Sequence, residues 1–96
     1  MDDINLDWDQ ANIQHIAKHK ISQLEVEQVL KNDPMDMKFE IVEGEDRWTS
    51  VGHTDRGRVL LVVWTIRSEA CRVVTAWPAG FEIKSAYLKG VKQKHA

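Results

Sequence analysis

The stretch EDRWTSVGHTDRGRVLLVVWTIR, residues 45–67, contains two strand-like segments on either side of a short turn. Residues 47–54 have strand-like character, and residues 58–67 include the unbroken apolar run VLLVVW, which favours a strand covered on both faces. The Asp-Arg-Gly sequence at residues 55–57 predicts a tight turn. This stretch therefore predicts a β-hairpin whose second strand lies in the centre of a sheet.

Two further strands are predicted on either side of this hairpin. Residues 35–42 have β-compatible side chains and are followed by a turn at Gly44, while residues 71–77 follow the turn sequence RSEA and end before Pro78. Because the connections are short, we expect the four strands to form an antiparallel meander.

Helices are predicted before and after the meander. An extended start at residues 4–8 leads to a helix that Asp7 or Asp9 caps and that runs to about residue 18. Ser22 and Glu25 form a capping box that begins a second helix, which ends near Pro34. The side chains expected to face inward are Ile13, Ile16 and Ala17 on the first helix and Leu24, Val26, Val29 and Leu30 on the second.

The predicted fold class is α+β, with an N-terminal helical hairpin packed on a four-stranded antiparallel sheet and a C-terminal helix. The last helix is expected over residues 81–88, and the basic residues 89–96 are expected to be a frayed, flexible tail. With 96 residues, the chain is expected to be one domain, residues 1–96.

Composition favours a cytoplasmic protein. The longest apolar run is six residues, the N-terminus is acidic, and the lone Cys71 cannot form an internal disulfide. The net charge of −2 divides unevenly, because residues 1–46 hold 12 acidic and 4 basic side chains while residues 47–96 hold 3 and 9. The basic half can form a positive face that holds phosphates, unless the fold mixes the two halves.

His15 and His19 are four residues apart, so both imidazoles can lie on one face of a helix. A metallopeptidase helix needs a glutamate directly after the first histidine, where this chain has Ile16. A structural zinc site needs four ligands, and His53 and His95 are far along the chain. We therefore predict no metal site and no cofactor, and interpret the two histidines as polar positions of an amphipathic helix.

The order of several short motifs resembles one family. These motifs are LDWDQAN near the start, KHKIS at residues 18–22, Asp33–Pro34, residues 45–65, RVVTAWPA at residues 72–79, and Tyr87. Together they resemble the BrnT toxins of bacterial toxin–antitoxin pairs, which are ribonucleases with a fold related to the RelE group. The resemblance implies that Asn12, Lys18 and His19 fix the helical hairpin. His19 can also cap the helix C-terminus.

RNA cleavage without a metal needs a proton acceptor, a proton donor and cations around one phosphate. Adjacent strands can bring side chains onto a common face, so Arg47, His53, Arg58 and Arg72 are the predicted catalytic residues. Arg56, Lys84 and Tyr87 are the predicted RNA-binding residues. The alternative is that these are ordinary solvent-facing side chains.

Two positions depart from the family pattern. The resemblance implies an arginine where this chain has Trp77 and a glutamate where it has Ile83. Glu82 is one residue before Ile83, which on a helix is a rotation of ~100°, so its carboxylate need not point in the direction of the family's glutamate. Tryptophan can stack on a base but cannot neutralise a phosphate. Trp8, Trp48 and Trp64 are expected to pack in the core or on the sheet.

The leading hypothesis is a metal-independent endoribonuclease toxin that inhibits translation by cleaving RNA. The resemblance implies that a small ribbon-helix-helix antitoxin (BrnA-like) neutralises it, with a dimer within that complex as one arrangement. The acidic half of the chain can steer a positively charged antitoxin segment, or it is a solvated helix face. The competing hypothesis is a BrnT-like module that binds RNA or a protein but has lost cleavage. A metal-binding structural protein is the third.

Overall fold

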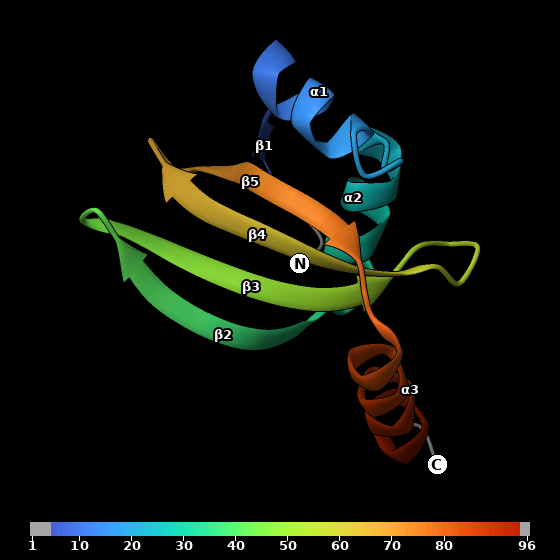
Figure 1. Ribbon diagram of the computed structural model, residues 1–96. Helices are drawn as coiled ribbons and strands as arrows, with labels where there is room; N and C mark the ends of the chain where they lie inside the picture. Colours follow the sequence, from blue (N-terminus) through green and yellow to red (C-terminus); the bar gives the residue numbers. More distant parts are fainter. Residues whose placement is uncertain (1–4, 95–96) are drawn as a thin grey trace.

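The computed structural model describes residues 5–94, and it has an α+β fold in which helices lie on both faces of a sheet (Figure 1). In chain order the elements are β1 (Leu6–Asp7), α1 (Gln10–Ala17), α2 (Gln23–Lys31), β2 (Met35–Val42), β3 (Glu45–His53), β4 (Val59–Arg67), β5 (Ala70–Pro78) and α3 (Phe81–Lys94). The predicted α+β class is confirmed, and the predicted arrangement needs two corrections.

The first correction concerns the sheet, which has five strands in the order β1-β5-β4-β3-β2 and is mixed. The strands β2 to β5 form the expected antiparallel meander, but β1 pairs in parallel with β5, with Leu6 opposite Cys71. The Cys71 N–H donates to the Asn5 carbonyl at 2.7 Å. A two-residue strand has too few residues for a pattern of alternation, so the sequence predicted an extended segment but not its pairing. Residue 4 lies outside the described residues.

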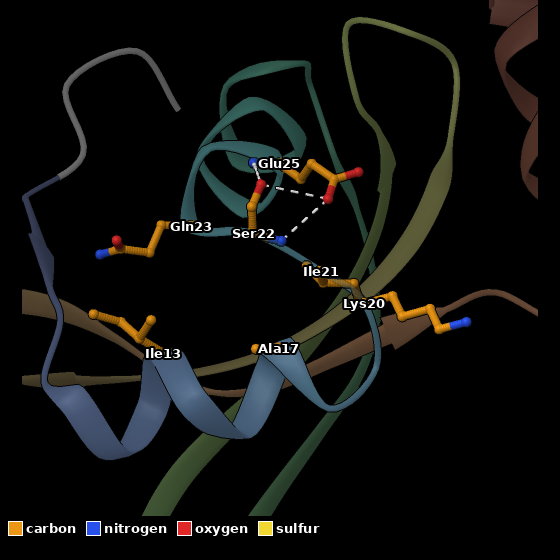
Figure 2. Close-up of a pocket in the computed structure, with 7 residues that line it drawn as sticks. All are labelled: Ile13, Ala17, Lys20, Ile21, Ser22, Gln23 and Glu25. Atoms are coloured by element: carbon orange, nitrogen blue, oxygen red, sulfur yellow. Dashed lines mark hydrogen bonds between the residues drawn. The ribbon is translucent and has the colours of Figure 1, made fainter.

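The second correction concerns the two N-terminal helices, which do not pack along each other as a simple hairpin. Helix α1 packs on β5, whereas α2 packs on β3 and β4. Figure 2 shows α1 from the side and α2 nearly along its axis, so the two axes cross steeply. The turn between them includes Lys20 with φ of 60°. Each helix therefore covers its own part of the same sheet face.

The predicted helix starts are confirmed. Asp9, rather than Asp7, caps α1 by accepting a hydrogen bond from the Asn12 N–H at 2.8 Å. Ser22 and Glu25 form the capping box of α2. Local side-chain chemistry fixes these starts, which is why the sequence predicts them.

The core has two parts, one on each sheet face. On the face covered by α1 and α2, the buried side chains include Ile16, Val26, Val29, Leu30, Leu60, Val62 and Trp64, with Trp8 and Trp48 packed against them. On the other face, Val51, Val59 and Leu61 of the sheet and Tyr87 of α3 are buried together in a second cluster. The expectation that Trp8, Trp48 and Trp64 pack on the core and sheet is confirmed.

Two residues predicted to face inward are exposed. Leu24 is 61% exposed, and Ala17 also faces solvent. Leu24 is two residues before the buried Val26, which is a rotation of about 200° on a helix, so both cannot face the sheet.

Helix α3 is longer than predicted and ends at Lys94 rather than residue 88, so residues 89–94 are helical rather than a frayed tail. The helix projects from the end of the sheet, away from α1 and α2 (Figure 1). The shorter prediction treated the basic residues from 89 onward as a terminal segment that frays. Among residues 5–94, no helix is long and apolar enough to cross a membrane.

Candidate functional site

Each of the three arginines predicted to be catalytic forms an ion pair with a carboxylate of this chain. Arg47 lies at the start of β3, where its Nε is 3.1 Å from the Glu45 carboxylate, and Arg67 contacts the other oxygen of Glu45 at 2.6 Å. These hydrogen bonds, first from Arg67 and then from Arg47, hold the pKa of Glu45 below its ordinary value. The carboxylate therefore already neutralises part of the charge that was predicted to bind a phosphate.

Arg72 is also paired within the chain. It lies on β5 beside β1, where its Nη1 is 3.2 Å from the Asp7 carboxylate and its Nη2 contacts Asp9. Asp9 is the residue that caps α1. The Arg72 guanidinium therefore ties β5 to β1 and to the start of α1.

Arg58 points toward the sheet face that α1 and α2 cover, which is the face opposite α3. Its Nη1 donates to the Lys20 carbonyl at 2.7 Å and is 3.0 Å from the Glu25 carboxylate of α2. Burial raises the pKa of Glu25, but hydrogen bonds from the Ser22 N–H and from Arg58 outweigh it, so the pKa lies below its ordinary value. Arg58 therefore fastens the turn between α1 and α2 to the sheet.

His53 stands at the other end of β3 from Arg47, and the six-residue separation spans about 20 Å of strand. Its Nδ1 is 2.7 Å from the Tyr87 hydroxyl of α3. Tyr87 is 2% exposed, so its ring is covered rather than open for stacking on a base. The Tyr87 hydroxyl holds the imidazole of His53 through Nδ1, and the other ring nitrogen, Nε2, takes no part in this contact. The role of Tyr87 in RNA binding stays a prediction.

A cleft of about 250 Å³ lies beside this pair, where the end of α2, the end of β3 and α3 meet. Its lining residues are Lys31, Asn32, Asp33, Met35, His53, Tyr87 and Val91. Asn32 fixes the geometry, because its Nδ2 donates to the His53 carbonyl at 2.9 Å and to the Asp55 carboxylate at 3.0 Å.

Lys31 supplies a cation at this cleft that sequence reasoning missed. It is exposed in the last turn of α2, and it forms no ion pair with the residues that the structure describes. In the sequence, Lys31 is marked only by its position just before Asn-Asp-Pro, where the helix was predicted to end. Nothing in the sequence around Lys31 indicates that it lies close to His53.

The remaining predicted RNA-binding residues lie near the same end of the sheet. Arg56 is exposed in the loop after His53, and Lys84 is exposed on α3, three residues before Tyr87. Within residues 5–94 neither forms an ion pair. The cations available to an anion are therefore at the His53 end rather than at the arginines predicted to be catalytic.

The two positions that depart from the resemblance share one location. Trp77 and Ile83 are both half-buried and pack against the cluster of Val51, Val59, Leu61 and Tyr87. Both side chains therefore add to the apolar packing around the tyrosine that holds His53.

A second pocket, of about 450 Å³, lies between α1 and α2 (Figure 2). Its lining residues are Ile13, Ala17, Lys20, Ile21, Ser22, Gln23 and Glu25. The Ser22 and Glu25 side chains are engaged in the capping box, and Glu25 also binds Arg58. This pocket lacks a histidine and is therefore a weaker candidate for proton transfer.

His15 and His19 have their ring centroids 5.9 Å apart in an edge-to-face arrangement. In the part of the chain that the structure describes, no group of three or more His, Cys, Asp or Glu side chains could hold a metal ion. His95 lies outside the described residues. Cys71 is buried, and burial raises its pKa to about 11, so it remains a protonated thiol near neutral pH.

Comparison with known families decides the chain's class. The family model described as "Ribonuclease toxin, BrnT, of type II toxin-antitoxin system" matches residues 8–80. The chain belongs to the BrnT family. No curated protein matches the chain. The BrnT match ends just before α3, so His53 lies inside the matched region while Ile83 and Tyr87 lie outside it.

Proposed function

We propose that this BrnT-family protein is a metal-independent endoribonuclease toxin that inhibits translation by cleaving RNA, with His53 as its catalytic residue. We infer that a small antitoxin of the ribbon-helix-helix class neutralises it, and membership of a toxin–antitoxin family supports an antitoxin as the partner. The observation that carries the proposal is the His53–Tyr87 contact of 2.7 Å at the edge of a cleft that also contains Lys31.

In the proposed reaction, the ribose 2′-hydroxyl attacks the adjacent phosphorus while His53 Nε2 accepts its proton. The bond from phosphorus to the 5′-oxygen breaks, and the leaving oxygen takes a proton from solvent. The products are a 2′,3′-cyclic phosphate and a 5′-hydroxyl. Lys31, with Arg56 from the adjacent loop, balances the charge that develops on the phosphate oxygens.

Cleavage of a labelled RNA oligonucleotide in the presence of EDTA tests this proposal. We expect His53→Ala to lower the rate by ~10²–10⁴, the usual contribution of a general base. His15→Ala is the matched control, because His15 is an exposed histidine on α1. Equal rates for wild type and His53→Ala would overturn the assignment of His53, and loss of all cleavage in EDTA would overturn metal independence.

The second candidate function is a BrnT-like binding module without cleavage. Its support is the packing of Trp77 and Ile83 into one apolar cluster, because the resemblance implies charged side chains at both positions. If RNA cleavage requires charged side chains at positions 77 and 83, the wild type binds RNA without cleaving it. A salt-dependent RNA affinity with no cleavage product would favour this second function.

Trp77→Arg alone would place an unpaired cation in the apolar cluster and should destabilise the fold by ~3 kcal/mol. Trp77→Arg combined with Ile83→Glu supplies a partner and should be less destabilising. Circular dichroism must show a folded protein before either rate is interpreted. A folded double variant that cleaves RNA faster than an inactive wild type would support the binding module, and no gain would count against it.

A further inference from the structure

A groove of about 250 Å³ lies beside the cleft that contains His53, between α3 and strands β2 and β3. Met35 and Tyr87 line both the cleft and the groove. The other lining residues of the groove are Met37, Val51, Glu82, Ile83 and Ala86. Because the Tyr87 hydroxyl contacts His53, a single side chain connects the proposed proton acceptor to this groove.

The apolar walls of the groove can hold a flat aromatic ring. Met35 and Met37 are 44% and 48% exposed, and the thioether of methionine makes favourable contacts with aromatic rings. A cavity of about 150 Å³ can hold a benzene ring, so a groove of about 250 Å³ has room for the larger ring of a purine. The groove is therefore large enough for one nucleobase.

A bulge in β2 ends the apolar wall of the groove. Met37 is the extra residue of this bulge, where the pairing of β2 with β3 shifts register between Asp36 and Lys38. After the bulge, Phe39 lies on the opposite sheet face, where its ring centroid is 5.3 Å from that of Trp48. The apolar surface beside α3 therefore stops at Met37 rather than continuing along the strand.

Glu82 adds a carboxylate to this groove. It is exposed in the first turn of α3, and it forms no ion pair with the residues that the structure describes. An ionised carboxylate only accepts hydrogen bonds, so it repels a phosphate and favours a group with N–H donors. The part of an RNA chain that fits the groove is therefore a base rather than the backbone.

Guanine matches an ionised carboxylate better than the other three bases do. Its Watson–Crick edge presents two adjacent donors, N1–H and the N2 amino group, to the two carboxylate oxygens. Adenine and cytosine present one amino donor beside a ring nitrogen that accepts, and uracil presents one N–H between two carbonyl oxygens. Each of these three bases would therefore place an acceptor against the second carboxylate oxygen.

We propose that this groove is a guanine-binding subsite, in which Glu82 determines specificity by accepting hydrogen bonds from the base that precedes the scissile phosphate. This role of Glu82 rests on the proposed RNA cleavage at His53, because the nucleotide in the groove is the one that supplies the attacking 2′-hydroxyl. The BrnT match covers residues 8–80 and does not extend to Glu82, so the subsite is inferred from this chain's own α3.

Titration with the four nucleoside 3′-monophosphates tests the subsite without a cleavage step. Guanosine 3′-monophosphate should bind the wild type roughly tenfold to a hundredfold more tightly than the other three, the usual discrimination of one bidentate contact with a base. Its binding should also shift the NMR signals of the Met35 and Met37 methyl groups. Glu82→Gln should remove the preference, because one carboxylate oxygen is replaced by an amino group that meets a donor of guanine.

Glu43→Gln is the matched control for this titration. Glu43 is an exposed glutamate in the turn between β2 and β3, at the opposite end of the sheet from His53. The control should bind guanosine 3′-monophosphate as the wild type does. Far-UV circular dichroism shows whether Glu82→Gln keeps its helices.

A change in the substrate separates recognition of the base from a structural role of Glu82 in α3. Inosine in place of one guanosine of an RNA oligonucleotide removes the N2 amino group and keeps N1–H. The wild type should cleave after inosine with a kcat/KM about tenfold lower than after guanosine, the effect of one lost hydrogen bond to a charged group. Glu82→Gln should cleave both RNAs at similar, reduced rates.

The binding and cleavage results distinguish failure of the subsite from failure of the ribonuclease function. Equal affinity of the wild type for the four nucleotides, or preference for another base, would overturn the guanine subsite whether or not RNA is cleaved. A guanine preference that persists in Glu82→Gln would overturn the role of Glu82. Selective binding of guanosine 3′-monophosphate by a wild type that cleaves no RNA would support the subsite and count against the proposed ribonuclease.

Discussion

At the scale of single residues, the contact between His53 and Tyr87 joins a strand to a helix that are 34 positions apart in the chain. The sequence indicated His53, because it is the histidine on a predicted strand. It could not indicate the partner, because the contact depends on how α3 returns to the sheet. The same limit applies to Arg58 and Arg72, whose acidic partners lie on α2 and near β1.

Tyr87→Phe tests whether Tyr87 positions His53. The change removes the hydroxyl and keeps the ring, so we expect the unfolding free energy to fall by about 1 kcal/mol, the usual value of one hydrogen bond. If His53 is the proton acceptor, kcat should fall while KM stays nearly constant, because the imidazole loses its orientation. An unchanged kcat in single-turnover measurements would show that the hydroxyl only stabilises the fold.

At the scale of elements, the turns show which local conformations the sequence could predict. Gly44 marked the β2–β3 turn, and it has a φ of 80°. The β4–β5 turn carries positive φ at both Ser68 and Glu69, at 49° and 66°, without a glycine. The strand twist imposes this conformation, so the sequence predicted the turn there but not its backbone geometry.

Glu69→Gly should stabilise the protein, because glycine adopts a positive φ without the steric cost that a side chain brings. We expect a gain of about 1 kcal/mol in the unfolding free energy from urea titration. The control is Glu27→Gly in the interior of α2, where the same change should cost about 1 kcal/mol. Destabilisation by Glu69→Gly would mean that the Glu69 side chain makes an important contact in solution.

At the scale of the whole molecule, ion pairs connect elements that are distant in sequence, and two of the paired carboxylates make stability depend on pH. The folded-state pKa values of Glu25 and Glu45 both lie below the ordinary value of 4.5. Their stabilising contribution is therefore fully present above about pH 4.5 and is lost as the pH falls through the lowered folded-state values.

Glu45→Gln should lower stability at neutral pH and make the decline below pH 4.5 less steep, because the neutral amide cannot pair with Arg47 and Arg67. Thermal unfolding from pH 7 to pH 3 measures both effects. Glu27→Gln is the control, since Glu27 forms no ion pair among residues 5–94. Parallel stability curves for Glu45→Gln and wild type would contradict this account.

The parallel pairing of β1 with β5 has a consequence for how the protein is made. Strand β1 can pair with β5 only after Cys71 and Arg72 have been synthesised. The Tyr87 hydroxyl that contacts His53 is synthesised later still. At a synthesis rate of ~5–20 residues per second, His53 is made seconds before its tyrosine. During that interval the nascent chain carries the imidazole of His53 without the hydroxyl that holds it, so the proposed RNA-cutting centre can assemble only after Tyr87 has been made.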